Sequence, residues 1–273
     1  MSKRKRGLPE GWYPDGYTSV ERLIGQWTAD NQNGKEGIAA IIPHAGWTFS
    51  GRLSALGLSA LRDDLDCLVV AGGHLAPGDV FRLAEEDFFS VPGGSLPGHR
   101  KLLDFLSERL PWRPDGAGDN TVEIQLPMVR YFWGELPVLW IRVPPDAQAL
   151  ELGELLYEWT GLSGEKLGIA GSTDLTHYGP SYGFLSRGTG KAARDWVLEE
   201  NDGDVVRAMV SGESQRVLEL AADTRAACSA GGAAAAMEFA RLNGRKQGKL
   251  LGYASSYDIH PSDSFVGYAS IVF

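Results

Sequence analysis

The chain has 273 residues, a formal net charge of −9 and 43% hydrophobic residues, a composition typical of a globular protein with a sizeable core. The negative charge opposes the phosphate neutralisation that nonspecific nucleic-acid binding requires, so we expect no nucleic-acid partner. No apolar stretch approaches the length of a bilayer span, so we expect no association with a membrane. Two cysteines, Cys67 and Cys228, are too few for a disulfide framework and indicate a reducing compartment, the cytoplasm.

The N-terminus carries a dense basic run at residues 3–6. This run resembles the start of a signal peptide, but the segment GLPEGW follows it, where a signal peptide needs a continuous apolar stretch. We therefore expect residues 1–7 to form a disordered basic tail. No internal repeat or long linker divides the remainder, which predicts a single α/β domain over residues 8–273.

Hydrophobic periodicity predicts alternating helices and strands, and hence a mostly parallel central sheet covered by helices. The predicted helices span residues 18–31, 50–63, 97–110, 121–132, 146–159, 191–220 (with breaks near Gly203 and Gly212) and 223–242. The predicted strands span residues 38–42, 66–72, 136–143, 166–171, 250–255 and 265–273, with a short strand pair between residues 80 and 91. Turn-forming residues predict connections at residues 31–34, 92–94 and 111–118.

Histidines follow two of the predicted strands. The strand 38–42 ends at Pro43, which cannot continue a hydrogen-bonded ladder, and His44 comes next. The strand 66–72 leads through a glycine to His74. Because the carboxyl ends of parallel strands meet at one edge of a sheet, we expect both imidazoles at the same edge. A purely structural role is the alternative for either histidine.

A thiolate at Cys228 would complete a set of three metal ligands. Glycines follow Cys228 near the start of a predicted helix, where backbone N–H groups and the helix dipole favour a thiolate. With His44 and His74, this thiolate offers three ligands and leaves a coordination position open. The three are far apart in sequence, so the fold must bring them together. Cys67, in the middle of a predicted strand, is expected to be an ordinary buried side chain.

Asp174 and His177 follow the predicted strand 166–171. A carboxylate three residues before an imidazole on one turn can orient that imidazole for general-base catalysis. A loop histidine whose hydrogen bonds are already satisfied is the alternative.

Aromatic residues follow His44 closely. Trp47 and Phe49 either line a pocket for an aromatic ring or pack in the core. His99 and His260 lie in predicted surface turns, and no function is assigned to them.

Several motifs resemble those of the Memo-like proteins, also called AmmeMemoRadiSam system protein B. Residues 43–51 (PHAGWTFSG) resemble the PHAGYxYSG signature of that family, and residues 171–179 (GSTDLTHYG) are the second specific motif. Supporting segments occur in the family's order: residues 73–74 (GH), residues 123–127 (EIQLP), Cys228 before a helix, and residues 266–269 (VGYA). The resemblance spans most of the chain.

The resemblance implies the fold of the LigB-type class III extradiol dioxygenases, in which two histidines and a carboxylate hold non-haem iron(II). It implies that His44 and His74 are the histidine ligands and that Cys228 stands in the position of the carboxylate. His177 would match the acid/base histidine of that fold, with Asp174 beside it. Iron(II) is the expected metal, and copper or zinc are alternatives because a thiolate is a softer ligand than a carboxylate.

The chain also departs from the family pattern. Asp119 and Asn120 stand where Memo-like proteins commonly have Glu-His, and Leu75 stands where a second histidine often follows the metal-binding one. These changes remove imidazoles that could transfer protons near the site.

Three functions are compatible with these observations. The first is a non-haem iron oxidoreductase or dioxygenase acting on a small substrate, for which an aromatic compound is one candidate. The second is a non-catalytic metal-binding or interaction module with a protein partner. The third is a Cys-His hydrolase, with Cys228 as nucleophile and His177 with Asp174 as base and orienting group. The sequence does not predict the substrate or the oligomeric state.

Overall fold

The computed structural model describes residues 1–31, 34–116 and 118–273. The helices are α1 (Tyr17–Thr28), α2 (Trp47–Ser59), α3 (Arg100–Ser107), α4 (Asn120–Glu123), α5 (Leu126–Trp133), α6 (Gln148–Ser163), α7 (Lys191–Trp196), α8 (Asp202–Val210), α9 (Ser214–Thr224), α10 (Ala230–Leu242) and α11 (Ser256–Ile259). The strands are β1 (Lys3–Arg4), β2 (Ala39–Ile42), β3 (Cys67–Gly72), β4 (Phe81–Leu83), β5 (Phe88–Val91), β6 (Gly94–Pro97), β7 (Trp112–Pro114), β8 (Val138–Arg142), β9 (Leu167–Ser172), β10 (His177–Tyr178), β11 (Lys249–Ser255) and β12 (Phe265–Val272).

The large sheet has the order β10-β12-β2-β9-β3-β8-β4-β7, and β11 pairs with β12. Its centre is parallel, since β9 pairs in parallel with both β2 and β3, and β3 pairs in parallel with β8. Antiparallel strands flank this centre: β12 on β2 and β4 on β8. The predicted fold class, one α/β domain with a mostly parallel central sheet covered by helices, is confirmed.

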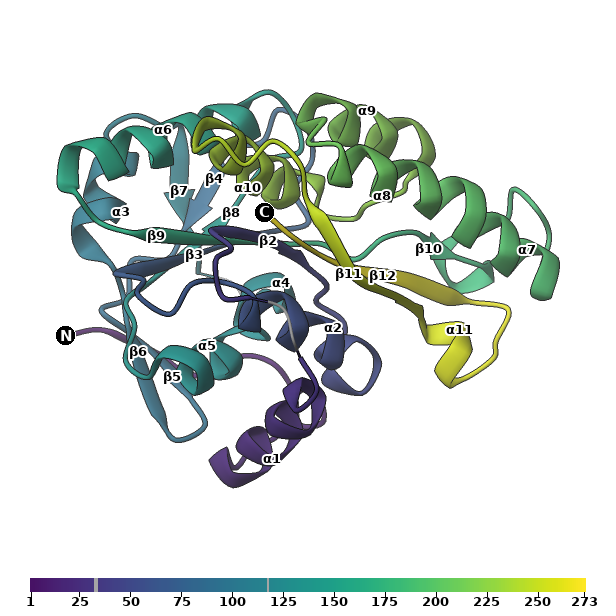
Figure 1. The fold of residues 1–273 in the computed structure, drawn as a ribbon, viewed down its shortest axis with the longest axis horizontal. Helices are drawn as coiled ribbons and strands as arrows, with labels where there is room; N and C mark the ends of the chain where they lie inside the picture. The colour runs from purple at the N-terminus through teal and green to yellow at the C-terminus, as the bar shows by residue number, and fades with distance from the viewer. Residues whose placement is uncertain (32–33, 117) are drawn as a thin grey trace.

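Both faces of the sheet are covered by helices, which explains the nearly continuous apolar runs in the central strands. In β3, Val69 packs in the cluster that includes side chains of α6 and α10. Its neighbours Leu68 and Val70 point to the opposite face and pack in the cluster that includes side chains of α1 and α2. Figure 1 shows these two layers of helices on either side of the sheet. None of the described helices is both long and apolar enough to span a membrane.

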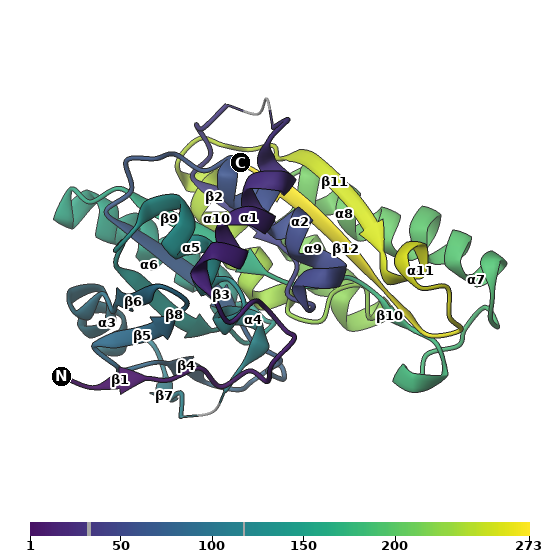
Figure 2. The same ribbon diagram turned by 90° about the horizontal axis from the view of Figure 1, so that it is seen from below.

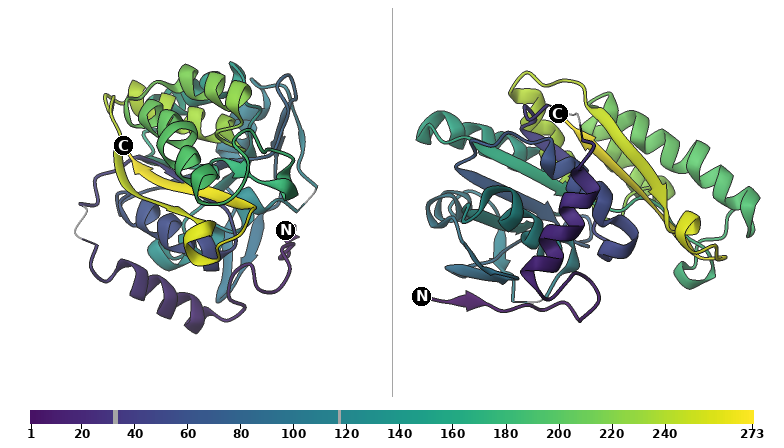
Figure 3. Two further views of the ribbon diagram at one scale, coloured as in Figure 1. Left: turned by 90° about the vertical axis from the view of Figure 1, so that its right-hand side faces the viewer. Right: turned by 60° about the horizontal axis from the view of Figure 1, so that its bottom comes forward.

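The strands β11 and β12 extend beyond the rest of the sheet and end beside α7 and α11 (Figures 2 and 3). A small apolar cluster of Tyr178, Ala193, Val197 and Phe265 holds this end together. The extension therefore supplies a second group of loops close to the carboxyl ends of the central strands.

The N-terminal segment is ordered, where the sequence predicts a disordered tail. The strand β1 pairs in parallel with β5. The Arg4 guanidinium lies 4.5 Å from the ring centroid of Trp140, and it also forms an ion pair of 3.1 Å with Glu86. The prediction of a disordered tail for residues 1–7 is wrong because partners distant in sequence receive these basic side chains.

Three other predicted elements differ from the structure. The predicted strand pair between residues 80 and 91 is wrong, because β4 joins the large sheet and β5 joins a small sheet with β1 and β6. The predicted helix 223–242 is interrupted at residues 225–229, and these residues carry Cys228. The predicted loop 111–118 contains β7. Residue 117 of that loop, and residues 32–33 of the predicted turn 31–34, lie outside the described residues.

The start of α10 packs against the central strands so closely that it requires glycine. A Cβ atom at Gly232 would lie 2.2 Å from the backbone oxygen of Ala71 in β3. Likewise, a Cβ atom at Gly171 in β9 would lie 2.6 Å from the backbone oxygen of Gly232. These contacts fix the start of α10, and the residues before it, against the ends of β3 and β9.

We predict that Gly232→Ala lowers the free energy of unfolding by about 2–3 kcal/mol, because the added methyl group overlaps the β3 backbone. Urea unfolding followed by circular dichroism measures this change. The control is Gly161→Ala in α6, where a Cβ atom would meet nothing within 4 Å. We expect Gly161→Ala to leave stability unchanged or to raise it by about 0.5 kcal/mol through helix propensity. Equal stabilities of the two variants would contradict the close packing.

Candidate metal centre

Three neighbouring strands present the polar residues of the site in the same way. His44 comes two residues after the end of β2, His74 two residues after β3, and Asp174 two residues after β9. Because β9 lies between β2 and β3 in the sheet, Asp174 leaves the sheet between the two histidines. The expectation that both imidazoles lie at one edge of the sheet is confirmed.

Local hydrogen bonds hold the loop that carries His44. The backbone oxygen of Pro43 accepts hydrogen bonds of 2.7 Å from Gln125 Nε2 and from Ser54 Oγ. The backbone oxygen of His44 accepts a hydrogen bond of 3.2 Å from Asn120 Nδ2. The imidazole is therefore attached to a rigid turn, and its Nδ1 lies 3.2 Å from Ser172 Oγ.

His74 is positioned by a glycine. Gly73 has φ +106, and a Cβ atom there would lie 2.5 Å from Cβ of Arg142 in β8. The chain can make this turn only with glycine, because a side chain would be strained by the positive φ and would also overlap β8. The turn sets the His74 ring edge-on to His44, with ring centroids 5.1 Å apart and an interplanar angle of 87°.

Cys228 reaches the site from the segment between α9 and α10. Its backbone N–H donates a hydrogen bond of 3.1 Å to the backbone oxygen of Asp174, and the next residue, Ser229, donates to Thr173 Oγ1. The Cys228 sulfur lies 3.3 Å from His44 Nε2. One ligand atom from each of His44, His74 and Cys228 lies within 4.8 Å of the others. The structure thus brings together the three residues predicted as metal ligands.

The donor set fits a bound metal ion. Metal–nitrogen bonds of about 2.0–2.1 Å and metal–sulfur bonds of about 2.3 Å place two ligand atoms roughly 3–4 Å apart. The separation of 3.3 Å between the Cys228 sulfur and His44 Nε2 agrees with this. Burial lowers the pKa of His44, and partial burial and the nearby His44 lower the pKa of His74. Both imidazoles are therefore favoured in the neutral form that binds metals.

The predicted stabilisation of a Cys228 thiolate by the helix start is wrong for this structure. Burial, reinforced by the charge of Asp174, raises the pKa of the thiol. The helix α10 begins two residues later, at Ala230. Cys228 must therefore lose its proton when it binds a metal ion. Cys67 is fully buried in β3 and belongs to the apolar core.

Asp174 lies at the centre of the site and is almost fully buried. Its Oδ1 accepts a hydrogen bond of 2.7 Å from the backbone N–H of His44. Its Oδ2 lies 3.9 Å from His44 Nε2 and 3.8 Å from His177 Nε2. Burial opposes the charged form, but His44, His177 and the backbone hydrogen bond together lower the pKa of Asp174. This carboxylate therefore stays ionised between two imidazoles.

His177 belongs to β10, which pairs with β12 opposite Val266. The separation of 3.8 Å from Asp174 is too long for a hydrogen bond, so the predicted pair is close but not joined. Within the described residues, His177 Nε2 is buried without a hydrogen-bond partner. The ring packs against Tyr182, with centroids 5.0 Å apart. The His177 side chain as a whole is 33% exposed and lines the cavity described next.

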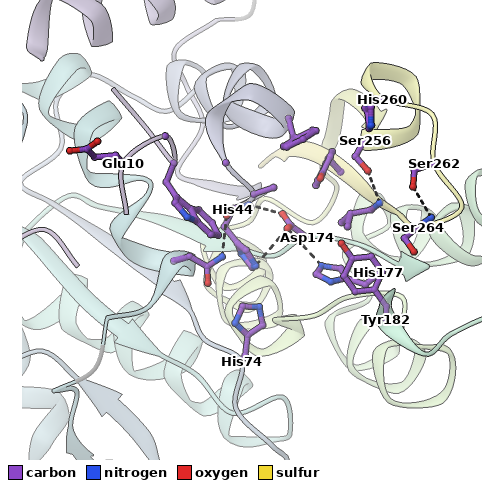
Figure 4. A pocket seen from close by; sticks show the side chains of 18 residues that line it. Glu10, His44, His74, Asp174, His177, Tyr182, Ser256, His260, Ser262 and Ser264 are labelled. Atoms are coloured by element: carbon purple, nitrogen blue, oxygen red, sulfur yellow. Dashed lines mark hydrogen bonds and ion pairs between the residues drawn. The ribbon is translucent and has the colours of Figure 1, made fainter. Parts of the chain in front are cut away.

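A cavity of about 580 Å³ opens above these residues. Figure 4 shows His44, His74, Asp174 and His177 gathered on one side of it. The other lining residues are Glu10, Gly11, Trp12, Ala45, Gly46, Phe49, Asn120, Tyr182, Ser256, His260, Ser262, Ser264, Val266 and Tyr268. Most of these come from loops that the sequence gives no reason to place together.

Of the two aromatic residues after His44, Phe49 lines the cavity, but Trp47 does not. Trp47 is buried in the core and donates a hydrogen bond of 3.1 Å from Nε1 to the backbone oxygen of Ile124. His260, for which the sequence suggests no function, lies on the rim. Its side chain reaches the cavity only because β11 and β12 extend past the sheet.

The residues that depart from the family pattern have structural contacts. Asp119 accepts a hydrogen bond of 2.9 Å from Arg142 and caps the start of α4 by accepting from the backbone N–H of Thr121. Asn120 lines the cavity and supports the backbone of His44. Neither residue supplies an imidazole for proton transfer.

Together, the parallel strand ends and the two-histidine, one-cysteine cluster define an α/β protein with a candidate metal centre beside a cavity. The family model described as Memo-like protein matches residues 5–272, and the chain belongs to this family. The family indicated by the sequence motifs is therefore confirmed.

Related proteins match nearly the whole chain. A MEMO1 family protein from Pyrococcus furiosus is 26% identical in an alignment 279 residues long, gaps included, that covers 96% of this chain and 95% of the relative. A MEMO1 family protein from Methanosarcina acetivorans is 27% identical over 246 residues, which cover 87% of this chain and 86% of the relative. The crystal structure of an uncharacterized protein from Escherichia coli K12 superposes with a TM-score of 0.54 at 12% identity, covering 87% of this chain and 100% of that one. This last similarity concerns the fold alone.

Behind the site, a buried carboxylate fixes the strand that carries His177. Asp202, at the start of α8, accepts hydrogen bonds from the backbone N–H of Thr176 (3.0 Å) and from the Tyr253 hydroxyl (2.7 Å). Burial raises the pKa of Asp202 to about 6 despite these hydrogen bonds. Protonation of Asp202 is therefore easier in the folded protein than in the unfolded chain.

We predict that Asp202→Asn changes how stability depends on pH. A carboxyl group whose pKa is raised by folding does not reduce the free energy of unfolding below pH 4. As the pH rises, it reduces the free energy of unfolding more and more, until the pH passes the folded pKa of about 6. Relative to wild type, Asp202→Asn should therefore gain about 2–3 kcal/mol of unfolding free energy between pH 4 and pH 7.5. Denaturant unfolding at a series of pH values measures this. Asp204→Asn, at an exposed position, is the control, and parallel profiles for wild type and Asp202→Asn would refute the prediction.

Proposed function

We propose that His44, His74 and Cys228 hold iron(II) and that the cavity beside them binds a small, oxygenated aromatic substrate for redox chemistry. The observation that carries this proposal is the convergence of three donor atoms within 4.8 Å, with two of the three residues, His44 and His74, lining a cavity of about 580 Å³. Copper and zinc are the alternative metals, because the thiolate is a soft ligand. Two neutral histidines and one thiolate leave coordination positions for other ligands.

Iron(II) bound here would offer its open coordination positions to other ligands and would supply the electrons for oxygen-dependent chemistry. The protein contributes the proton transfer. The His177 imidazole, which lines the cavity and is 33% exposed, accepts the hydroxyl proton of a phenolic substrate. The Asp174 carboxylate, 3.8 Å away, stabilises the imidazolium that results. Asp174 thus acts on His177 as a nearby negative charge.

The walls of the cavity suit an aromatic ring. Trp12, Phe49, Tyr182 and Tyr268 line it together with the site residues. Aromatic side chains bind ring substrates through edge-to-face and offset-stacked contacts and exclude water from the reacting atoms. These contacts favour a planar substrate whose hydroxyl group points toward the histidines.

A metal-binding module that acts with a protein partner is the second candidate function. The contacts of Asn120 favour it, because this residue replaces an imidazole of the family pattern and is engaged with the His44 backbone. Such a protein would bind iron(II) without consuming oxygen.

A Cys-His hydrolase receives less support. The Cys228 sulfur lies beside His44 rather than beside the proposed base, His177. Burial raises the pKa of the thiol and lowers the pKa of His44, so the pair favours its neutral form. A nucleophilic cysteine needs the thiolate. Both cysteines are free thiols, which is consistent with the cytoplasm as the proposed location.

We predict that wild-type protein, incubated anaerobically with iron(II) and desalted, retains about one iron per chain, as expected for a single cluster of three ligands. Cys228→Ser should lose most of this iron, because a hydroxyl group is a poor substitute for the thiolate. Iron is measured by elemental analysis. Cys67→Ala, which removes the other thiol from a core position, is the matched control and should keep its iron. A Cys228→Ser variant with full iron content, or wild type without iron, would refute the proposed site.

We predict that His177→Asn keeps its iron but loses oxygen uptake with catechol as the probe, by about 10²- to 10⁴-fold, the usual contribution of general acid–base catalysis. An oxygen electrode measures the uptake against protein-free iron. His99→Asn is the control, because His99 caps α3 away from the cavity and asparagine preserves a cap. If wild-type uptake does not exceed that of free iron, the enzyme proposal fails and the metal-binding module remains.

A further inference from the structure

A second cavity, of about 350 Å³, also contacts His177 and Tyr182. It shares these two side chains with the larger cavity and is otherwise lined by Leu175, Ala221, Arg225, Ala227 and Cys228. In Figure 4, His177 and Tyr182 stand together at the edge of the larger cavity. The two cavities are therefore neighbours that share these two rings.

The candidate metal centre faces both cavities through different residues. His44 and His74 line the larger cavity, whereas Cys228 lines the second one. A small molecule in the second cavity could therefore touch Cys228 without occupying the space for the substrate. A substrate in the larger cavity and a small molecule in the second cavity could thus approach the same candidate metal centre separately.

The second cavity contains a cationic side chain with an unusual backbone. Arg225 has φ 55 and is the one non-glycine residue with positive φ in the described part of the chain. This left-handed conformation ends α9, because Arg225 is the C-cap residue of that helix and its backbone N–H donates to the backbone oxygen of Ala221. The residue is exposed, so a ligand can reach its side chain.

The charge of Arg225 is available to a ligand. Its guanidinium lies 5.6 Å from the Phe184 ring, and within residues 1–31, 34–116 and 118–273 no carboxylate forms an ion pair with it. Guanidinium groups bind carboxylates through two parallel hydrogen bonds. In a chain with a net charge of −9, an unpaired arginine beside a cavity is a local site of attraction for anions.

We propose that the second cavity binds a small organic carboxylate, which pairs with Arg225 and lies next to Cys228. The apolar side chains of Leu175, Ala221 and Ala227 would cover a short carbon chain, which favours an organic acid over inorganic phosphate. The proposal goes beyond the metal-dependent function, because it depends on the cavity and on Arg225 and not on a bound metal.

The test compares alkylation of Cys228 by iodoacetate, which carries a carboxylate, and by iodoacetamide, which is neutral and of similar size. The full-length protein is first treated with a chelator, and labelled peptides are quantified by mass spectrometry. Both reagents attack the same Cys228 thiolate, so both labelling rates are proportional to the fraction of Cys228 that is ionised. The ratio of the iodoacetate rate to the iodoacetamide rate is independent of that fraction, and it measures the preference of the cavity for an anion. Cys67, which is fully buried, should stay unlabelled and so shows that the protein remains folded.

We expect Arg225→Gln to lower the iodoacetate/iodoacetamide ratio at Cys228 by about three- to tenfold at low ionic strength, with the iodoacetamide rate unchanged. Raising the salt concentration should reduce the difference between the two proteins. Arg187→Gln is the matched control, because Arg187 lies over Trp196 and does not line the cavity. Its ratio should equal that of wild type.

A competition experiment identifies the anion. Propionate should slow iodoacetate labelling of wild type more than phosphate or chloride does at equal ionic strength, and this protection should be absent in Arg225→Gln. Equal ratios in wild type and Arg225→Gln, or no labelling of Cys228 by either reagent, would overturn the proposal. Stronger protection by phosphate would also overturn it, in favour of an oxyanion site. Iron content is measured separately, so failure here is distinguishable from failure of the metal site.

Discussion

The buried carboxylate of Asp174 is the interaction on which the site depends. Its side chain accepts a hydrogen bond from the backbone of His44, and its backbone oxygen accepts one from Cys228. One residue thus joins the end of β2, the end of β9 and the segment between α9 and α10. A buried charge is costly unless it is paired or hydrogen-bonded, so these partners are held firmly in place. A cation between His44, His74 and Cys228 would offset the same charge, in keeping with the proposed metal centre.

The protonation states of the site follow from burial. Burial favours neutral imidazoles and a protonated thiol, while hydrogen bonding and neighbouring imidazoles keep Asp174 ionised. The same arrangement leaves His177 Nε2 without a partner in the described structure. The His177 side chain lines both cavities, so a ligand in either one can contact it.

Much of the fold could be predicted from local patterns, because buried apolar runs that end in proline or glycine mark strand ends. His44 and His74 were placed at one sheet edge for this reason. Cys228 lies 184 residues from His44, and no local spacing links the two, so its prediction as a ligand depends on the glycines that follow it and on the family resemblance. The raised pKa of its thiol, the pairing of β1 with β5 and the loops around the cavity depend on tertiary contacts, which a local pattern does not contain.

The sheet order has a consequence for how the protein assembles. The strands β2 and β3 are consecutive in the chain, yet β9 separates them in the sheet. Since β9 begins at Leu167, the ends of β2 and β3 reach their final spacing only after most of the polypeptide has been made and paired. Contacts over such long sequence separations form slowly, so the site matures late in folding. A metal ion that binds only the finished cluster would stabilise the complete topology over any partly folded form.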